Sequence, residues 1–130
     1  MPTLKIWDEA IPGRPSLASA IVVAETRLTA REVIRRRVRQ EVEKHNESLP
    51  EVFQGLVQPE ESEQILNGFR MRVRRPLDWE AQFARACSSF GRNGFLLLVD
   101  GRQITELDEP LELHPESEVQ FVKLVPLVGG

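Results

Sequence analysis

The stretch that decides the fold is the C-terminal segment Gly94–Gly130, GFLLLVDGRQITELDEPLELHPESEVQFVKLVPLVGG. Within it, the apolar run Phe95–Val99 is typical of a strand, and Asp100-Gly101 predicts a tight hairpin turn into a second strand. The residues between this hairpin and Glu118 predict a compact connector anchored by Leu107 and Leu111. Residues 118–124 then alternate in the manner of a last strand, and residues 125–130 leave it as a tail.

The N-terminal part predicts a hairpin followed by a helix. Strands are expected at Leu4–Trp7 and Ala20–Ala24, with a loop at Pro12–Ser16 between them. Thr29 and Glu32 have the spacing of a capping box, which predicts a helix from about Ala30 to Lys44. Apolar residues recur along this helix at helical spacing: Ala30, Val33, Ile34, Val38 and Val42.

Residues 47–93 form a less regular segment between that helix and the third strand. Glu60–Leu66 predicts a short helix, and Phe69–Arg74 alternates apolar and basic residues with the period of a strand. Asp78 is placed to cap a second helix. That helix carries four side chains of apolar character: Trp79, Phe83, Cys87 and Phe90.

Composition narrows the class of protein. A chain of 130 residues with 41% hydrophobic residues fits one domain, which we place at 1–130 with an insertion at 47–93. A net charge of −3 gives no general attraction to nucleic acid or anionic membranes. No stretch has the length of a membrane span, and the acidic N-terminus argues against a secretory signal, so we expect a cytoplasmic protein.

The residues that usually carry catalysis are scarce. The chain has two histidines and no tyrosine, and it lacks the common nucleophile, metalloprotease, phosphate-loop and dinucleotide motifs. The one cysteine, Cys87, excludes an internal disulfide and a multi-cysteine metal site. His45 stands near the end of the first helix, where its charge could meet the helix dipole, and His114 lies in a loop. We therefore expect no metal, no cofactor and no enzymatic activity.

The order hairpin, helix, insertion, hairpin, connector, strand and Gly129-Gly130 resembles that of ubiquitin-like β-grasp proteins. The resemblance rests on Gly94–Gly130 and, by pattern alone, on residues 4–45. It implies an α+β fold in which a mixed sheet wraps on one main helix. The apolar residues Pro126, Leu127 and Val128 replace the arginines of the ubiquitin tail, and in this they resemble sulfur carriers of thiamine and molybdopterin synthesis and small archaeal modifiers.

This resemblance implies that the working group is the carboxylate of Gly130. An adenylating enzyme would activate it with ATP, and residues 126–128 would be read as the tail. Bacterial ubiquitin-like modifiers are the nearest class, some implicated in defence against phage. They are encoded beside activating, conjugating and deconjugating metalloprotease-type enzymes, which would be the partners together with an acceptor target. Two alternatives stay open: a sulfur carrier that forms a thiocarboxylate at Gly130, and a non-catalytic interaction module.

Two groups of arginines are candidate partner surfaces. Arg31 and Arg35 share a face of the first helix with Arg39, where the ordinary interpretation is a solvated face balanced by glutamates. Arg70, Arg72 and Arg74 would project from one side of a strand, and a charged edge strand is the ordinary interpretation there. The alternative is that either group selects an acidic partner. The acidic total argues against nucleic acid.

Overall fold

The computed structural model describes residues 3–11, 14–65 and 68–124. The chain divides into two compact units: residues 1–33 together with 90–130, and residues 34–89. Helices α1 (Ala30–Ser48) and α2 (Trp79–Gly91) each begin in one unit and end in the other. The chain is thus an α+β protein with a mixed sheet, as predicted.

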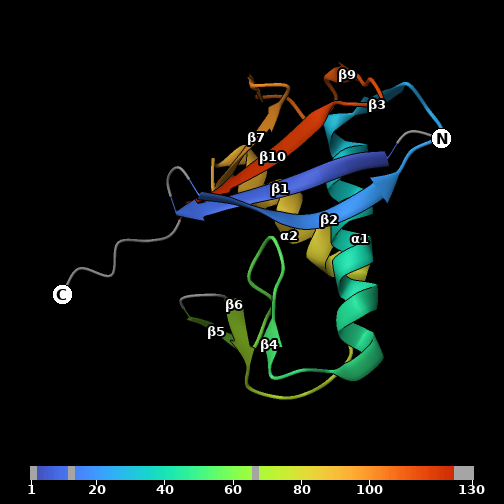
Figure 1. Cartoon of the computed structure of the whole chain (residues 1–130). Helices are drawn as coiled ribbons and strands as arrows, with labels where there is room; N and C mark the ends of the chain where they lie inside the picture. Colours follow the sequence, from blue (N-terminus) through green and yellow to red (C-terminus); the bar gives the residue numbers. More distant parts are fainter. Residues whose placement is uncertain (1–2, 12–13, 66–67, 125–130) are drawn as a thin grey trace. The chain divides into compact units, whose positions relative to one another are not determined.

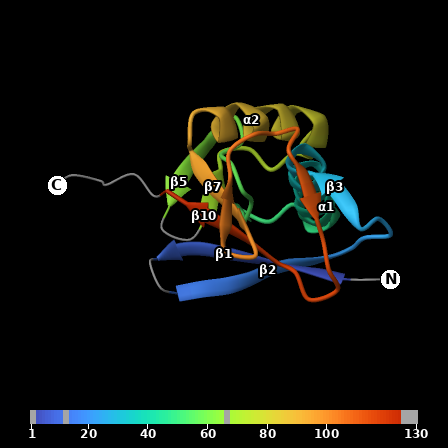
Figure 2. The same cartoon turned by 90° about the horizontal axis from the view of Figure 1, so that it is seen from above.

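The first unit is built on a five-stranded sheet in the order β2-β1-β10-β7-β8 (Figures 1 and 2). β1 is parallel to β10, whereas β1–β2, β10–β7 and β7–β8 are antiparallel pairs. The last strand therefore lies in the middle of the sheet. The strands are β1 (Thr3–Ile11), β2 (Arg14–Val22), β7 (Phe95–Val99), β8 (Arg102–Ile104) and β10 (Glu118–Lys123).

Local signals account for several of these elements. Asp100 and Gly101 have φ of 50° and 80°, the left-handed angles that a two-residue hairpin turn requires, so the predicted turn is confirmed. The Asp100 carboxylate also accepts hydrogen bonds from the Glu118 amide (2.9 Å) and from the Ser117 hydroxyl (3.1 Å). The turn between β7 and β8 is thereby joined to the start of β10.

The connector contains a strand that the sequence did not predict. β9 (Pro110–Glu112) pairs with β3 (Arg27–Thr29), and within this pair Leu111 is buried opposite Leu28. The first residues of α1 donate their amides to this connector, Ala30 to the carbonyl of Glu109 and Arg31 to that of Leu107. The Thr29 hydroxyl accepts the Glu32 amide at 3.2 Å, which confirms the predicted cap.

The core of the first unit follows the alternation of its strands. The largest fully buried side chains are Leu4, Ile6, Leu97, Ile104, Leu111 and Phe121. Phe95 lies 5.7 Å from Phe121 and 6.0 Å from Phe90 between ring centres, a geometry typical of packed aromatic side chains. The second predicted strand was placed too late, because β2 begins at Arg14 rather than Ala20. An edge strand tolerates Pro15, which the prediction read as part of a loop.

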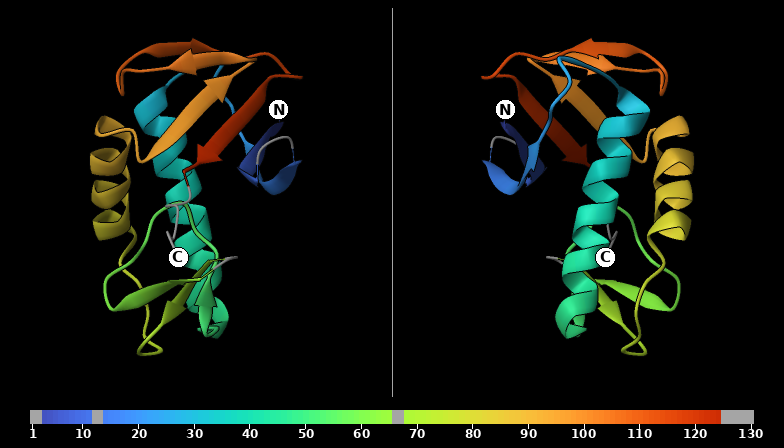
Figure 3. Two further views of the ribbon diagram at one scale, coloured as in Figure 1. Left: turned by 90° about the vertical axis from the view of Figure 1, so that its left-hand side faces the viewer. Right: turned by 90° about the vertical axis from the view of Figure 1, so that its right-hand side faces the viewer.

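The second unit combines most of α1 and α2 with a three-stranded antiparallel sheet in the order β4-β6-β5 (Figure 3). The strands are β4 (Val52–Phe53), β5 (Ser62–Ile65) and β6 (Gly68–Met71). Phe53 is 1% exposed, and a side-chain carbon added at Gly55 would overlap its ring, so glycine is needed there. The Asp78 carboxylate accepts the Glu80 amide at 3.1 Å and starts α2 as predicted.

Two predictions in this unit are wrong. A short helix was predicted at Glu60–Leu66, but Ser62–Ile65 form strand β5, and Leu66 lies outside the described residues. Glu61 has φ of 54°, and the Ser62 hydroxyl donates to the Pro59 carbonyl at 2.7 Å, which closes a turn. The chain then pairs with β6 instead of coiling. The strand predicted at Phe69–Arg74 ends at Met71, and it lies between β4 and β5 rather than at an edge.

Candidate functional site

Gly129 and Gly130, and the tail residues Pro126, Leu127 and Val128, lie outside the described residues. The described part of the chain ends with β10 and Leu124, which lead directly into this tail. β10 pairs with β1 over Glu118–Val122 and with β7 over Val119–Lys123, so most of the strand has a partner on both sides. The last described strand is therefore a central strand of its sheet, not an edge strand.

One face of the five-stranded sheet carries apolar side chains that are only partly buried. In β7, Phe95, Leu97 and Val99 are buried, whereas the intervening Leu96 and Leu98 are only half-buried. Antiparallel sheets with one solvated face usually alternate apolar and polar residues, so the continuous apolar run in β7 indicates that both faces meet other groups. This run was read in the sequence as a strand, but its second apolar face was not recognised.

Neighbouring strands extend this apolar face. The register places Val122 beside Leu96, Gln120 beside Leu98, and Trp7 beside both Gln120 and Leu17. Leu17 is 55% exposed, and Trp7 and Val122 are half-buried. We call this group the exposed sheet face; it consists of Trp7, Leu17, Leu96, Leu98, Gln120 and Val122. The same register places Glu9 beside Val122 and Gln103 beside Leu98. An apolar group bordered by polar residues is typical of a protein-binding surface.

The end of β10 is held by two carboxylates of β1. The Gln120 side-chain amide donates a short hydrogen bond to Glu9, and Lys123 Nζ lies 3.4 Å from an Asp8 carboxylate oxygen. The register pairs Asp8 with Phe121 and Glu9 with Val122, so both acids stand beside the last residues before the tail. Sequence reasoning missed Asp8 and Glu9, because only the parallel β1–β10 pairing brings them there.

Arg31 and Arg35 have different surroundings. Within the first unit, Arg31 donates two hydrogen bonds to Asp108, at 3.0 and 3.2 Å. The hydrogen bond and the positive charge of Arg31 lower the pKa of Asp108. Within the second unit, the guanidinium of Arg35 stands 5.1 Å from the centre of the Trp79 ring, and that of Arg39 stands 5.2 Å from it. Arg31 and Arg35 therefore each contact other side chains of the chain and are not surrounded by solvent alone.

The arginines of the inserted unit are exposed, but they do not line a pairing edge. Arg70 belongs to the central strand β6, where its cross-strand neighbour in β5 is Glu63. Arg72 and Arg74 follow the strand, and Arg74 forms an exposed ion pair with Glu51 at 3.2 Å. The interpretation of this segment as an edge open to a partner strand is thus wrong. The side chains of Arg70, Arg72 and Arg74 are nevertheless exposed, so a partner could contact them.

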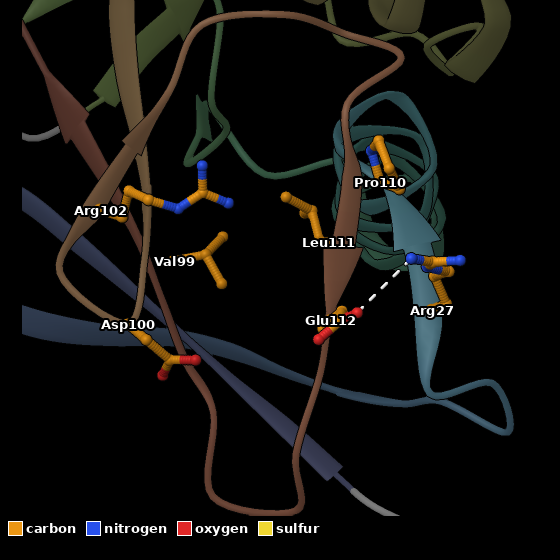
Figure 4. A pocket seen from close by; sticks show the side chains of 7 residues that line it. All are labelled: Arg27, Val99, Asp100, Arg102, Pro110, Leu111 and Glu112. Atoms are coloured by element: carbon orange, nitrogen blue, oxygen red, sulfur yellow. Dashed lines mark hydrogen bonds and ion pairs between the residues drawn. The ribbon is translucent and has the colours of Figure 1, made fainter.

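A cavity of about 420 Å³ lies between the β7–β8 hairpin and the β3–β9 pair (Figure 4). Its charged walls are balanced by the protein itself, because Arg27 pairs with Glu112 at 3.4 Å and Arg102 with Glu109 at 3.1 Å. Asp100 holds the start of β10, as described above. We assign this cavity no ligand. It is lined by Arg27, Val99, Asp100, Arg102, Pro110, Leu111 and Glu112.

No protein-family model, curated protein or solved structure matches the chain. Across the described ranges, histidine, cysteine and acidic side chains do not gather in any group of three that could hold a metal ion. Neither of the two described helices has the length and apolar character needed to cross a membrane. The register of β1, β7 and β10 defines the candidate site, which is the exposed sheet face together with the end of β10.

Proposed function

We propose that the chain is a ubiquitin-like modifier with a β-grasp fold, activated at the carboxylate of Gly130 by an ATP-dependent adenylating enzyme. The observation that carries this proposal is the position of β10. The final strand lies parallel to the first and between two hairpins, which is the arrangement that a β-grasp sheet requires. In this arrangement the strand that precedes the tail is the central one, and it contributes Gln120 and Val122 to the exposed sheet face.

The chemistry explains why the chain needs few reactive side chains. A carboxylate is a poor acyl donor until ATP converts it to an acyl adenylate, from which a thiol, amine or sulfide displaces AMP. The enzyme supplies this chemistry, and the modifier supplies an accessible terminus. Glycine at 129 and 130 suits this role, because it has no side chain to obstruct a narrow channel and accepts unusual backbone angles.

The exposed sheet face provides the docking surface for the activating enzyme in this proposal. Interface centres are enriched in aromatic and apolar side chains and depleted of charge. Trp7, Leu98 and Val122 meet that description, and Gln120 among them supplies a polar contact. The arginines Arg70, Arg72 and Arg74, with Arg31 and Arg35, are secondary candidates, for which an acidic partner surface would be complementary.

A sulfur carrier is the second candidate function. The apolar residues Pro126, Leu127 and Val128 favour it, because they resemble the tails of such carriers. The two functions share adenylation of Gly130 and differ in the next step. Sulfide would yield a thiocarboxylate on Gly130, whereas a modifier would form an amide or ester with its target. A pure interaction module would undergo neither step.

The test is to incubate the full chain with ATP and the adenylating-type enzymes of its own genome, and to measure pyrophosphate exchange. We expect exchange with one of them, and none for a variant lacking Gly129-Gly130 that keeps the circular dichroism spectrum of the wild type. Terminal residues contribute little packing, so this deletion should not unfold the protein. Undiminished exchange by the truncated chain would overturn the proposal. Mass spectrometry of the product then separates thiocarboxylate from conjugate.

A further inference from the structure

Strand β1 carries a positive, an aromatic and a negative side chain at alternating positions. Lys5, Trp7 and Glu9 lie on the face of the strand opposite to Leu4 and Ile6, which are buried in the core of the first unit. Lys5 is exposed, and Trp7 and Glu9 are half-buried. The strand thus presents two opposite charges on its outer face, each two residues from the same tryptophan.

The tryptophan belongs to a row of uncharged side chains that crosses all five strands of the sheet. From β2 to β8, the register places in this row Leu17, Trp7, Gln120, Leu98 and Gln103. Leu17 and Val22 of β2 are among the most exposed large apolar residues of the described chain, at 55% and 61%. Apolar side chains gathered on a surface and bordered by charges are typical of an interaction site.

This surface is complementary to itself. Two copies of the sheet can face each other about a two-fold axis that crosses β1 at Trp7, in the plane between the sheets and perpendicular to the strand. The rotation reverses the strand, so Trp7 meets Trp7, and Lys5 of each copy meets Glu9 of the other. The uncharged row then falls on the same row of the second copy. Self-complementary surfaces of this kind are what a symmetric dimer requires.

The geometry of packed sheets is compatible with these contacts. Sheets that pack face to face cross at about 30°, which displaces side chains two residues from the axis by only a few Å. A lysine side chain spans that displacement. Glu9 also has partners in its own chain, among them the Gln120 amide, but a carboxylate has lone pairs for more than one donor. Glu118, the register partner of Lys5, adds a second carboxylate near each lysine.

We infer that the exposed sheet face binds a second copy of this chain, with Trp7 at the centre and two Lys5–Glu9 ion pairs at the border. The chain itself supplies the matching charges, which favours a second copy over a partner of different sequence. The contact surface is small, so the dimer is reversible, with a Kd in the micromolar range. This inference does not depend on the proposed function. The dimer would cover the surface that we propose for docking of the activating enzyme, and only the monomer would then be activated.

Sedimentation equilibrium of the full chain over a range of concentrations tests the inference. We expect a monomer–dimer equilibrium for the wild type. Trp7→Ala should weaken it about thirtyfold, because a central tryptophan contributes most to such an interface. Lys5→Glu and Glu9→Lys each place like charges opposite one another at both borders. Each should weaken self-association about tenfold, since repulsion replaces attraction.

Mixing the two charge variants is the decisive measurement. Lys5→Glu has two acidic side chains beside Trp7, and Glu9→Lys has two basic ones. Equal amounts of the two should form a heterodimer about as tight as the wild-type dimer, although neither variant dimerises well alone. A chain with both substitutions should likewise dimerise as the wild type does. The control pair, Lys44→Glu and Glu47→Lys, makes the same charge changes at exposed positions of α1 and should leave self-association unchanged.

Three outcomes would overturn the inference. The first is a wild type that stays monomeric at concentrations up to about 1 mM. The second is a dimer that Trp7→Ala leaves intact, and the third is a mixture of charge variants that associates no better than each variant alone. If Trp7→Ala does not fold, the wild-type measurement and the charge variants still decide. No activating enzyme is used, so the pyrophosphate-exchange test and this one can fail independently.

Discussion

Three polar residues of α1, spaced four positions apart, lie in or near the interior of the second unit: Arg37, Glu41 and His45. Arg37 is 2% exposed and pairs with Glu41 at 3.4 Å, and the other Glu41 oxygen accepts the Leu56 amide at 3.0 Å. A buried charge is tolerated only when it is paired and hydrogen-bonded, and both conditions are met here. One turn further, His45 is buried with its ring 5.1 Å from that of Phe53, edge to face. His45 stands in the last turn of the helix as predicted, but burial favours its neutral ring.

This burial predicts a pH dependence of stability. Loss of hydration lowers the pKa of His45 below its ordinary value of 6.5. The unfolded chain then binds a proton that the folded chain resists, so the free energy of unfolding should fall as pH decreases from 6.5. Urea denaturation at pH 7.5 and pH 5 checks this. His45→Met should remove most of the difference, and His114→Gln should retain it. The pKa of Asp108 is lowered from 3.8, so its contribution is lost only at more acidic pH.

At the scale of elements, strand β7 has a core face and an exposed sheet face. Substitutions at the adjacent residues Leu97 and Leu98 test the two faces separately. Leu97 is fully buried, whereas Leu98 is half-buried on the exposed sheet face. Leu97→Ala should lower the free energy of unfolding by about 2–5 kcal/mol, because it removes packed methyl groups and leaves a cavity. Leu98→Ala should cost about 1 kcal/mol or less. Chemical denaturation of both variants measures the difference, and equal losses would show that the two faces are wrongly assigned. The folded Leu98→Ala protein is then suited to measuring whether the activating enzyme binds more weakly.

For the whole molecule, the distribution of charge affects how fast a charged partner associates. The net charge is −3, yet Arg70 and Arg72 are exposed on the second unit. If they steer an acidic partner, replacing both with glutamate should slow association about tenfold at low salt and remove most of its salt dependence. The matched control is Lys5→Glu with Lys44→Glu, which makes the same change in net charge at other exposed positions. Stopped-flow measurements at several salt concentrations compare the association rates of the arginine variant and the lysine control. Identical rates would show that the arginines do not steer the partner.

The sequence by itself determined the features that depend on a few neighbouring residues. The Thr29 and Asp78 caps and the Asp100-Gly101 turn were predictable, because the groups that form them lie within a few positions of one another. The diglycine end and the apolar tail were also readable directly. The same local reasoning failed at Glu60–Leu66. The composition of this segment is typical of a helix, but Ser62–Ile65 pair with β6 as a strand.

Only the tertiary structure decided which distant residues share a surface. The exposed sheet face requires β1, β2, β7 and β10 to be neighbours, and Asp8 reaches Lys123 only through the parallel β1–β10 register. Arg37 is likewise buried in an arginine-rich helix, and its partner Glu41 is bound by the amide of Leu56, which lies 15 positions further along the chain. Strand partners and burial are set by contacts between segments far apart in the chain, and such contacts leave no local pattern from which to predict them.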